Sequence, residues 1–407
     1  MKKILIVNCG SSSLKFSIYE MPHKNLICSG IFEALNSEKT GIYTFKCPNE
    51  KGEMIKVFSD VEMSTRTTHK EAIFKMKELL TDKSTGVISD LKEINAIGHR
   101  VVQGGDLFTE SKIIDDAVIE GIRKLTALAP LHNLAHITGI ELCTQLFGKD
   151  LPQVAVFDNA FHSTMPATSY MYALPYEFYE NDKIRKYGFH GTSHRYVASR
   201  VADIMNKPLE DIKLITCHLG NGCSITAIKD GKVLDTSMGF TPLDGFMMGT
   251  RCGAVDPSIV TYIMEHYKDL SPEDINNIMN KQSGALGISG VSSDDRVLAE
   301  AAMNGNTRAK LARDMQWYQI RKYIGSYIAA MNGVNAIAFM GGIGENCPEL
   351  REDVIKNLSY LNIDIDEKAN KQRGKEMEIT TNGSYVKAFV IPTNEELMIA
   401  CDTYELI

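Results

Sequence analysis

The sequence predicts an α/β protein with two related domains, and three observations support this interpretation. Short apolar segments typical of buried strands alternate with segments whose apolar residues recur at helical spacing. A strand–turn–strand pattern occurs over residues 4–19 and again, about half the chain later, over 214–228. The length of 407 residues suits two or three domains of ordinary size.

The repeated pattern consists of an apolar run, a turn of small and polar residues, and an alternating strand. The second copy is followed by KDGK at 229–232, which predicts a hairpin turn. One such hairpin is weak evidence, but two at this separation predict two related α/β domains. We place the first domain at 1–154 plus 393–407 and the second at 155–392.

Four further strands and several helices are predicted between and after the two copies. The strands are 94–97, 154–157, 336–339 and 388–391. Helical spacing predicts helices at 69–80, 130–147, 193–205 and 308–331. The tetrapeptide SPED at 271–274 predicts another helix, with serine as the N-cap, proline in the first position and acid in the first turn.

Composition and charge exclude several classes of protein. Hydrophobic residues make up 44% and charged residues 23%, as in ordinary globular proteins, and the net charge of −7 provides no basic field for nucleic acid or anionic lipid. Nine cysteines occur without a C-x-x-C pair, which predicts free thiols in a reducing cytosol. The apolar run at 4–7 is too short for a secretory signal, and no run is long enough to span a membrane. We therefore expect a cytoplasmic protein.

Polar or glycine-rich residues follow most of the predicted strands. These segments are 8–13, 98–100, 158–162, 218–222, 340–346 and 392–396. Because ligands bind outside the carboxyl ends of strands in open α/β sheets, the segments predict one large site. Glycine lets backbone N–H groups approach anion oxygens, and serine adds donors, so the Gly- and Ser-rich segments together predict phosphate. Each alone is also compatible with a tight turn, and no P-loop or dinucleotide fingerprint is present.

Two arginines, Arg100 and Arg251, are candidates for binding an anion, because a guanidinium binds carboxylate or phosphate bidentately. A structural ion pair is an equally good interpretation from the sequence. Histidines four residues apart at 132/136 and 190/194 could bind zinc, but neither pair has the H-E-x-x-H pattern or nearby thiolates, so zinc is not predicted. His190 precedes a predicted helix, where it could donate to an anion.

Three carboxylates at strand ends suit Mg²⁺, which prefers oxygen ligands and water. They are Asp158, Glu395 and Glu396. Their other interpretation is a favourable charge at a helix N-terminus, which we prefer for Glu396.

Taken in order, these motifs resemble the acetate kinase family over essentially the whole chain. The matching segments are NCGSSSLKF (8–16), HRVV (99–102), APLHN (129–133), FDNAFH (157–162), YGFHGTSH (187–194), HLGNG (218–222), GGIGEN (341–346) and PTNEE (392–396). Each motif is modest alone, but the ordered set is specific. The resemblance implies two duplicated RNase H-like domains, as in actin-like ATPases, around a nucleotide cleft. It also implies a homodimer whose contacts come mainly from the C-terminal domain.

The resemblance further implies roles by position, with acetate and ATP as substrates. Asn8 and Glu395 would position Mg²⁺, or Mn²⁺ in its place. The residues implied in catalysis are Arg100, His132, Asp158, His190 and Arg251, and those implied around the acetate methyl group are Val102, Leu131, Phe189 and Pro242. Those implied for the nucleotide and its phosphates are Lys15, His218, Gly220, Asn221, Gly222, Asp294, Asp295, Arg296, Gly341, Gly342, Ile343, Gly344 and Asn346.

The implied reaction is direct in-line phosphoryl transfer from ATP to acetate. Acetate is already ionised at neutral pH, so no general base is required. The closest alternative is a propionate kinase, and a non-catalytic actin-like ATP-binding protein is the alternative from another class.

Some positions depart from the family pattern. They are Gln103, Cys252, Ala254, Asp295 and Met340. We expect the last two to border the adenosine and to relax the choice of base.

Overall fold

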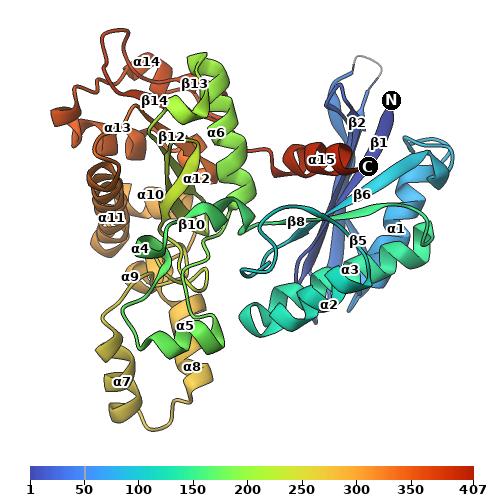
Figure 1. Cartoon of the computed structure of the whole chain (residues 1–407), viewed down its shortest axis with the longest axis horizontal. Helices are drawn as coiled ribbons and strands as arrows, with labels where there is room; N and C mark the ends of the chain where they lie inside the picture. The colour runs from blue at the N-terminus through green and yellow to red at the C-terminus, as the bar shows by residue number, and fades with distance from the viewer. Residues whose placement is uncertain (50–51) are drawn as a thin grey trace. The chain divides into compact units, whose positions relative to one another are not determined.

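Each of two units of the chain folds around its own β-sheet (Figure 1). The computed structural model describes residues 1–49 and 52–407, without the side chains of Pro130 and Leu131. Unit 1 comprises Met1–Ala160 and Asn394–Ile407, and unit 2 comprises Phe161–Thr393. In the part of the chain described, no helix is both long and apolar enough to cross a membrane.

The sheet of unit 1 has the order β5-β4-β3-β2-β1-β6-β8-β7. Strands β1 to β5 pair antiparallel, and β6 and β8 continue the sheet parallel to β1. The bounds are β1 Lys2–Cys9, β2 Ser13–Met21, β3 Asn25–Glu33, β4 Thr40–Pro48, β5 Met54–Thr65, β6 Ile94–Val101, β7 Lys112–Ile113 and β8 Gln153–Phe157. The parallel part brings the ends of β1, β6 and β8 to one edge.

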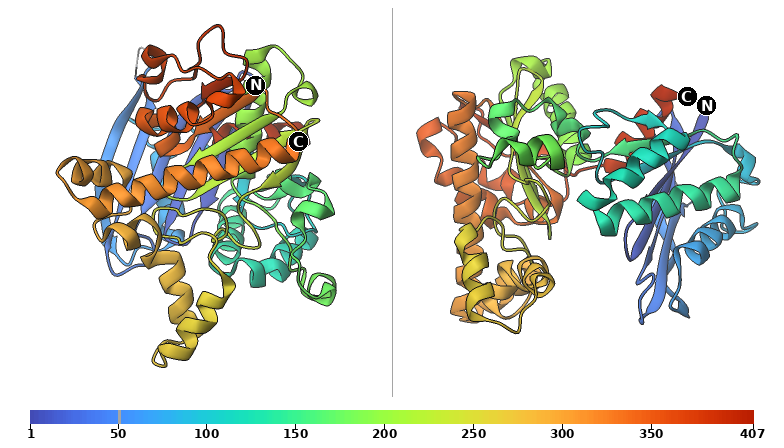
Figure 2. Two further views of the ribbon diagram at one scale, coloured as in Figure 1. Left: turned by 90° about the vertical axis from the view of Figure 1, so that its left-hand side faces the viewer. Right: turned by 60° about the horizontal axis from the view of Figure 1, so that its bottom comes forward.

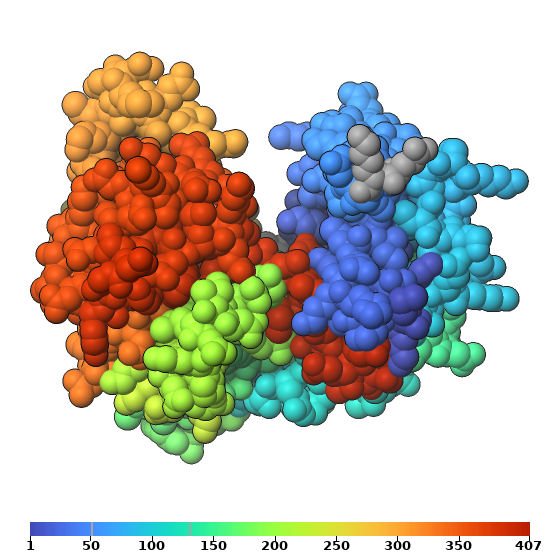
Figure 3. Space-filling model, turned by 90° about the horizontal axis from the view of Figure 1, so that it is seen from above, coloured from blue at the N-terminus to red at the C-terminus, as the bar shows by residue number. Residues whose placement is uncertain are grey.

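Both faces of this sheet are covered, which explains why β1 is an uninterrupted apolar run. Leu5 and Val7 pack in a core with helices α1 (His69–Thr81) and α3 (Pro130–Phe147). Ile4 and Ile6 point to the other face and pack against α15 (Glu395–Leu406), which brings the C-terminus against the N-terminal strands (Figure 3). The remaining helix of this unit is α2 (Asp116–Lys124).

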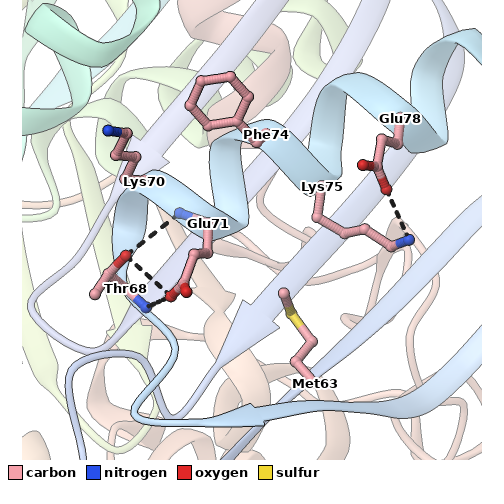
Figure 4. A pocket seen from close by; sticks show the side chains of 7 residues that line it. All are labelled: Met63, Thr68, Lys70, Glu71, Phe74, Lys75 and Glu78. Carbon is pink, nitrogen blue, oxygen red and sulfur yellow. Dashed lines mark hydrogen bonds and ion pairs between the residues drawn. The ribbon is translucent and has the colours of Figure 1, made fainter.

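Helix α1 begins with a capping box that the sequence analysis did not identify (Figure 4). The hydroxyl of Thr68 accepts from the amide of Glu71, whose carboxylate in turn accepts from the amide of Thr68 at 2.7 Å. The shallow groove drawn there, between β5 and α1, contains none of the predicted site residues. The capping box thus accounts for the start of the helix, and the site must be sought elsewhere.

The sheet of unit 2 has the order β11-β10-β9-β12-β14-β13. Its strands are β9 Leu214–Leu219, β10 Cys223–Lys229, β11 Lys232–Thr236, β12 Ala336–Met340, β13 Met377–Glu378 and β14 Lys387–Val390. Three antiparallel strands, β11-β10-β9, are followed by β12 and β14 parallel to β9, as β3-β2-β1 are followed by β6 and β8 in unit 1. The predicted α/β class with two duplicated RNase H-like sheets is therefore confirmed.

Two helices cover opposite faces of the second sheet. Val197, Ala198 and Val201 of α6 (Gly191–Met205) pack on one face, and α11 (Thr307–Met331) runs along the other (Figure 2). The other helices are α4 Ala167–Tyr170, α5 Tyr176–Asp182, α7 Pro257–His266, α8 Pro272–Asn277, α9 Gly284–Ser289, α10 Asp295–Met303, α12 Gly341–Asn346, α13 Pro348–Lys356 and α14 Glu367–Asn370. Short 3₁₀ segments are Leu91–Glu93, Leu125–Leu128, Ala160–Thr164, Leu209–Asp211 and Ser359–Leu361, and Ile278–Gln282 is a π-helical turn.

The predicted helices and strands are confirmed with small shifts at their ends. Three segments expected to be loops instead belong wholly or partly to a strand or a helix. Strand β6 continues to Val101 because it stays paired with β8, so Arg100 lies in the strand. His218 likewise lies within β9. The glycine-rich segment after β12 forms the short helix α12, and it begins at Gly341, whose φ of +77° lies in the left-handed region that favours glycine.

Arg351 of α13 is fully buried and holds α12 to the segment around α14. Its guanidinium donates to the carbonyl of Gly344 at 2.7 Å and to the carbonyl and side chain of Asn370 at 2.6 and 2.8 Å. These acceptors lie away from water, so each would lose its partner if the guanidinium were removed. Arg351 thereby fixes the end of the glycine-rich helix.

We predict that R351L destabilises unit 2 by about 3 kcal/mol or more, because an unsatisfied buried polar group costs about 1–3 kcal/mol. Thermal and urea unfolding measure the loss. The control is R296L, since the Arg296 side chain is 90% exposed and a surface change should stay within about 0.5 kcal/mol. Equal stability of the two variants would contradict the structural role of Arg351.

Candidate active site

In unit 1 three charged side chains meet where parallel strands end. Arg100 of β6 donates to the carboxylate of Asp158, which follows β8, at 3.0 Å, and its Nε lies 3.7 Å from Glu395 in the first turn of α15. Burial alone would lower the pKa of Arg100, but the carboxylates of Asp158 and Glu395 outweigh it and raise that pKa. The ion pair that the sequence analysis left open as an alternative is thus present, and Arg100 is a partly buried, oriented cation.

The loop after Arg100 is held by two asparagines whose function the sequence analysis missed. The side chain of Asn159 accepts from the amide of Gly104 at 2.7 Å and donates to the carbonyl of Gly105 at 2.9 Å. Asn133 of α3 donates to the carbonyl of Gln103 at 3.0 Å. Each asparagine directly follows a predicted site residue in its motif, and this position is the sequence signal that could have identified it.

The other predicted residues of unit 1 are distributed around this cluster. Val102 is buried directly after β6, and His132 lies in the first turn of α3, whereas the side chain of Leu131 lies outside the described residues. Asn8 at the end of β1 pairs with Lys15 across the β1–β2 ladder. Lys15 is exposed and lines a cavity of about 410 Å³ together with the start of α15.

In unit 2 two predicted catalytic side chains converge over a glycine. A Cβ on Gly222 would lie 3.3 Å from an Arg251 nitrogen and 3.6 Å from Nε2 of His190. His190 adopts a left-handed backbone, with φ of 59°, just before α6, which is uncommon for a residue other than glycine. Its ring stacks on that of His218 at 4.1 Å. Gly222 thus leaves a small space bordered by an imidazole and a guanidinium.

Arg251 is held differently from Arg100. Its guanidinium donates to the carbonyl of Pro242 at 3.2 Å, and in the described parts of the chain no carboxylate forms an ion pair with it. Burial lowers the pKa of the Arg251 guanidinium. A partly buried cation whose charge these residues leave uncompensated by carboxylate suits an anionic ligand. Phe189, beside His190, is buried.

A cavity of about 660 Å³ in unit 2 brings together many of the predicted nucleotide residues. They are Gly220, Asn221, Asp294, Asp295, Arg296, Gly342, Ile343 and Asn346. Ser293, Cys347 and Arg373 also line it and were not predicted. Gly341 and Gly344 are buried beside it, and a Cβ on Gly341 would lie 2.8 Å from the carbonyl of Leu219.

Comparisons with known proteins identify the family of this chain. The sequence pattern of the acetokinase family matches residues 3–401. The chain belongs to the acetokinase family. It is 52% identical over 404 residues to an acetate kinase of Clostridium botulinum (strain 657 / Type Ba4), with 99% of each chain covered. Among solved structures it is similar to an acetate kinase of Porphyromonas gingivalis (TM-score 0.91, 43% identity) and a propionate kinase of Francisella tularensis (0.90, 42%), with full coverage of both chains in each case. The resemblance predicted from the motifs is confirmed.

Two departures from the acetokinase pattern have structural explanations. Asp295 lines the cavity, but its carboxylate is bound to Arg313 at 2.9 Å, and the Arg313 guanidinium lies over the ring of Trp317 at 4.8 Å. The acidic charge is therefore compensated. The expectation that Met340 borders the adenosine is wrong, because its side chain is fully buried in the core between the sheet and α6.

Several histidines near the proposed sites are buried in the neutral form. Burial lowers the pKa of His99 to about 4, while its hydrogen bond to Gln153 opposes the shift. Burial, and then the charge of Arg100, hold the pKa of His136 well below its usual value. Burial also lowers the pKa of His194, with further contributions from His162 and His218. In the unfolded chain these groups would take up protons near their ordinary pKa of about 6.5.

We predict that the protein loses stability as the pH falls from 6.5 towards 4, the interval in which unfolded His99 binds a proton and folded His99 does not. Each such histidine contributes a slope of up to about 1.4 kcal/mol per pH unit. The fall in Tm between pH 7 and pH 5 should be smaller for H99Q than for the wild type. An equal fall in both proteins would mean that His99 is protonated in the folded state.

Proposed function

We propose that this chain catalyses the reversible, Mg²⁺-dependent transfer of the γ-phosphoryl group of ATP to acetate, giving acetyl phosphate and ADP. Membership of the acetokinase family and 52% identity to an acetate kinase support the reaction. The structural observation that carries the proposal is the convergence of Arg251 and Nε2 of His190 over Gly222, because this arrangement suits a phosphoryl group. The protein is accordingly a phosphotransferase with a carboxyl acceptor.

The proposed reaction requires the protein to bring two anions, acetate and ATP, close together. Carboxylic acids ionise with a pKa of about 4, so acetate needs no general base at neutral pH. The difficulty is the charge on the transferring phosphoryl oxygens, which oriented cations and N–H donors stabilise. Arg251 and His190 carry out this stabilisation in the proposal. Transfer is direct and in line, without a phosphoenzyme.

Unit 1 binds acetate in this proposal. The planar guanidinium of Arg100 suits a carboxylate, and the ion pair with Asp158 keeps it oriented. Val102 supplies a buried apolar surface for the methyl group, and Leu131 is proposed to extend it. Asp158 orients the substrate through Arg100.

Mg²⁺ fits the donors that unit 1 provides. The amide oxygen of Asn8 at the end of β1 and the carboxylate of Glu395 in α15 are hard oxygen ligands on elements packed together. Within residues 1–49 and 52–407, no three His, Cys, Asp or Glu side chains group as a metal site. Two protein ligands would leave positions for water and phosphate oxygens, as Mg²⁺ usually requires. When bound, the ion would neutralise charge on the phosphates, and Mn²⁺ could replace it.

Unit 2 binds the nucleotide in this proposal, with the adenosine in the cavity of about 660 Å³. The segment Gly220, Asn221 and Gly222 and the side chain of His218 would contact phosphates, and the resemblance also assigns Lys15 to the nucleotide. Because Asp295 is neutralised by Arg313, the pair offers acceptors without a net negative charge.

Propionate is the alternative acceptor, because a propionate kinase is among the similar structures. One methylene in an apolar pocket is worth only about 1–3 kcal/mol, so the fold does not discriminate the two acids. Buried Val102 favours acetate by limiting space. The ratios of kcat/KM for acetate, propionate and butyrate decide the acceptor.

We also propose a homodimer that works in the cytoplasm. Helix α7 has no buried residue and presents large apolar side chains, including Ile259 and Tyr262, to solvent. An apolar helix without a partner suggests an interface, and a second copy of the chain would cover it. All nine cysteines are free thiols, as expected in a reducing compartment.

We predict that wild-type protein with acetate, ATP and Mg²⁺ forms an acyl phosphate, which hydroxylamine traps as a hydroxamate. R251A should lower kcat by about 10²–10³, since it removes a donor to developing charge. R100A should lower kcat by a similar factor, since it removes the cation proposed to hold acetate in position for transfer. R200A is the matched control, because Arg200 pairs with Glu376 on the surface of unit 2. Absence of hydroxamate with the wild type would support a non-catalytic ATP-binding protein. Normal turnover of both variants would leave the arginines with a structural role only.

We predict that Y262E combined with I259E converts a dimer to a monomer, because two charges would be placed in the apolar face of α7. Sedimentation velocity at micromolar concentration measures the change. A wild-type monomer, or a variant that remains dimeric, would exclude α7 as the interface.

A further inference from the structure

A chain of hydrogen bonds links His190 to the interior of unit 2. Nδ1 of His190 lies 2.8 Å from Oγ of Ser224 on β10, and the same oxygen lies 2.8 Å from Nε2 of His194 on α6. Nδ1 of His194 lies 2.7 Å from the hydroxyl of Thr216 on β9. Ser224, His194 and Thr216 are all fully buried. The order from inside to outside is therefore Thr216, His194, Ser224, His190.

The direction in which protons are donated along this series of hydrogen bonds is fixed at its buried end. In the described residues the hydroxyl of Thr216 forms no hydrogen bond other than that to His194, so its proton must point at Nδ1 of His194 or be left without an acceptor. His194 is neutral, because burial holds its pKa well below the usual value. A neutral imidazole that accepts at Nδ1 carries its proton on Nε2. His194 therefore donates to Ser224.

The remaining steps follow from the single proton of a serine hydroxyl. Ser224 accepts from His194, so it uses its own proton to donate to Nδ1 of His190. Neutral His190 then carries its proton on Nε2, the atom that lies with Arg251 over Gly222. The opposite tautomer would present a lone pair to phosphoryl oxygens, which would repel it.

Other charged and titratable groups around His190 agree with a neutral donor. His218 stacks on its ring, His194 shares the hydroxyl of Ser224 with it, and the Arg251 guanidinium lies near it over Gly222. His162 lies next to His194, with ring centroids 5.6 Å apart. A cation on His190 would face Arg251 and would also require the direction of the whole chain to reverse. Arg251 thus supplies the positive charge, and His190 supplies an oriented N–H.

We propose that Ser224 is a positioning residue that, together with His194 and Thr216, keeps the proton of neutral His190 on Nε2, where it donates to the transferring phosphoryl group. The proposal rests on the proposed function only for its last clause. The tautomer of His190 is a property of the free protein and can be measured without catalysis.

The test compares kcat over pH for wild type and S224A. Without Ser224 the neutral tautomer is no longer fixed, whereas the imidazolium carries both protons in either protein. The deficit of S224A should therefore grow with pH, from about twofold below the ordinary histidine pKa to at least about tenfold at pH 8.5, since a wrong histidine tautomer can cost up to about 10⁴ in kcat. The KM for ATP should change less than kcat. A loss that is the same at every pH, or no loss, overturns the proposal.

Two threonines provide a matched pair of further variants. Thr216 and Thr226 are direct cross-strand partners on β9 and β10, and both are fully buried. Thr216 ends the chain to His190, while Thr226 bonds to His162 at 3.2 Å. T216V should show the same pH-dependent deficit as S224A, although it does not touch His190, and T226V should not. Equal behaviour of T216V and T226V overturns the proposal.

The direct measurement is nitrogen NMR of the free protein with ¹⁵N-labelled histidine, assigned with H190N. Wild-type His190 should give the signals of the Nε2–H tautomer at high pH, and S224A should give a mixture. A wild-type Nδ1–H tautomer overturns the proposal whether or not the protein makes acetyl phosphate. Conversely, a wild-type protein with the expected tautomer but no hydroxamate overturns the proposed function alone.

Discussion

The parallel pairing of strands beside an antiparallel hairpin is the constraint on which the two sites depend. β6 and β8 run parallel to β1 in unit 1, as β12 and β14 run parallel to β9 in unit 2. Parallel strands end at the same edge, so residues far apart in the sequence meet there without any local motif. Arg100 and Asp158 are 58 positions apart and yet form an ion pair at 3.0 Å. Each unit can therefore assemble charged groups that its short loops could not hold alone.

Three arginines that are fully or partly buried hold their positive charge in different ways, and the difference follows from what surrounds each one. The guanidinium of Arg351 donates to buried carbonyl acceptors and so stabilises the fold. Arg100 is oriented by Asp158 but keeps a further edge near Glu395. Arg251 has a carbonyl partner but no ion pair in the described residues. In a protein with a net charge of −7, such local cations are the means of attracting anionic substrates.

The fold class could be predicted from the sequence because, in each unit, the local apolar patterns agree with the strands and helices that form. Uninterrupted apolar runs predicted strands buried on both faces, and the helix predicted over 130–147 has the bounds of α3. The sequence was not sufficient where tertiary pairing decides, since the pairing of β6 with β8 places Arg100 inside a strand. Met340 was misplaced for the same reason, because alternation in β12 directs it into the core. The partner of Asp295 also could not be predicted from the sequence, because Arg313 lies on a helix whose packing no local pattern specifies.

The chemistry of the proposed acceptor explains why the protein would need an oriented neutral histidine more than an acid or base. Acetate arrives ionised, so a strongly basic side chain in the site would have no proton to remove. A second full cation beside Arg251 would bind the phosphates of ATP and of the products as well as those of the transition state, and uniform binding does not accelerate the step. A neutral N–H fixed by Ser224 is directional, and it strengthens only as charge develops on the oxygen it faces. The buried series of hydrogen bonds that ends at Thr216 is thus the part of unit 2 that holds the N–H of His190 oriented as a donor before the substrate binds.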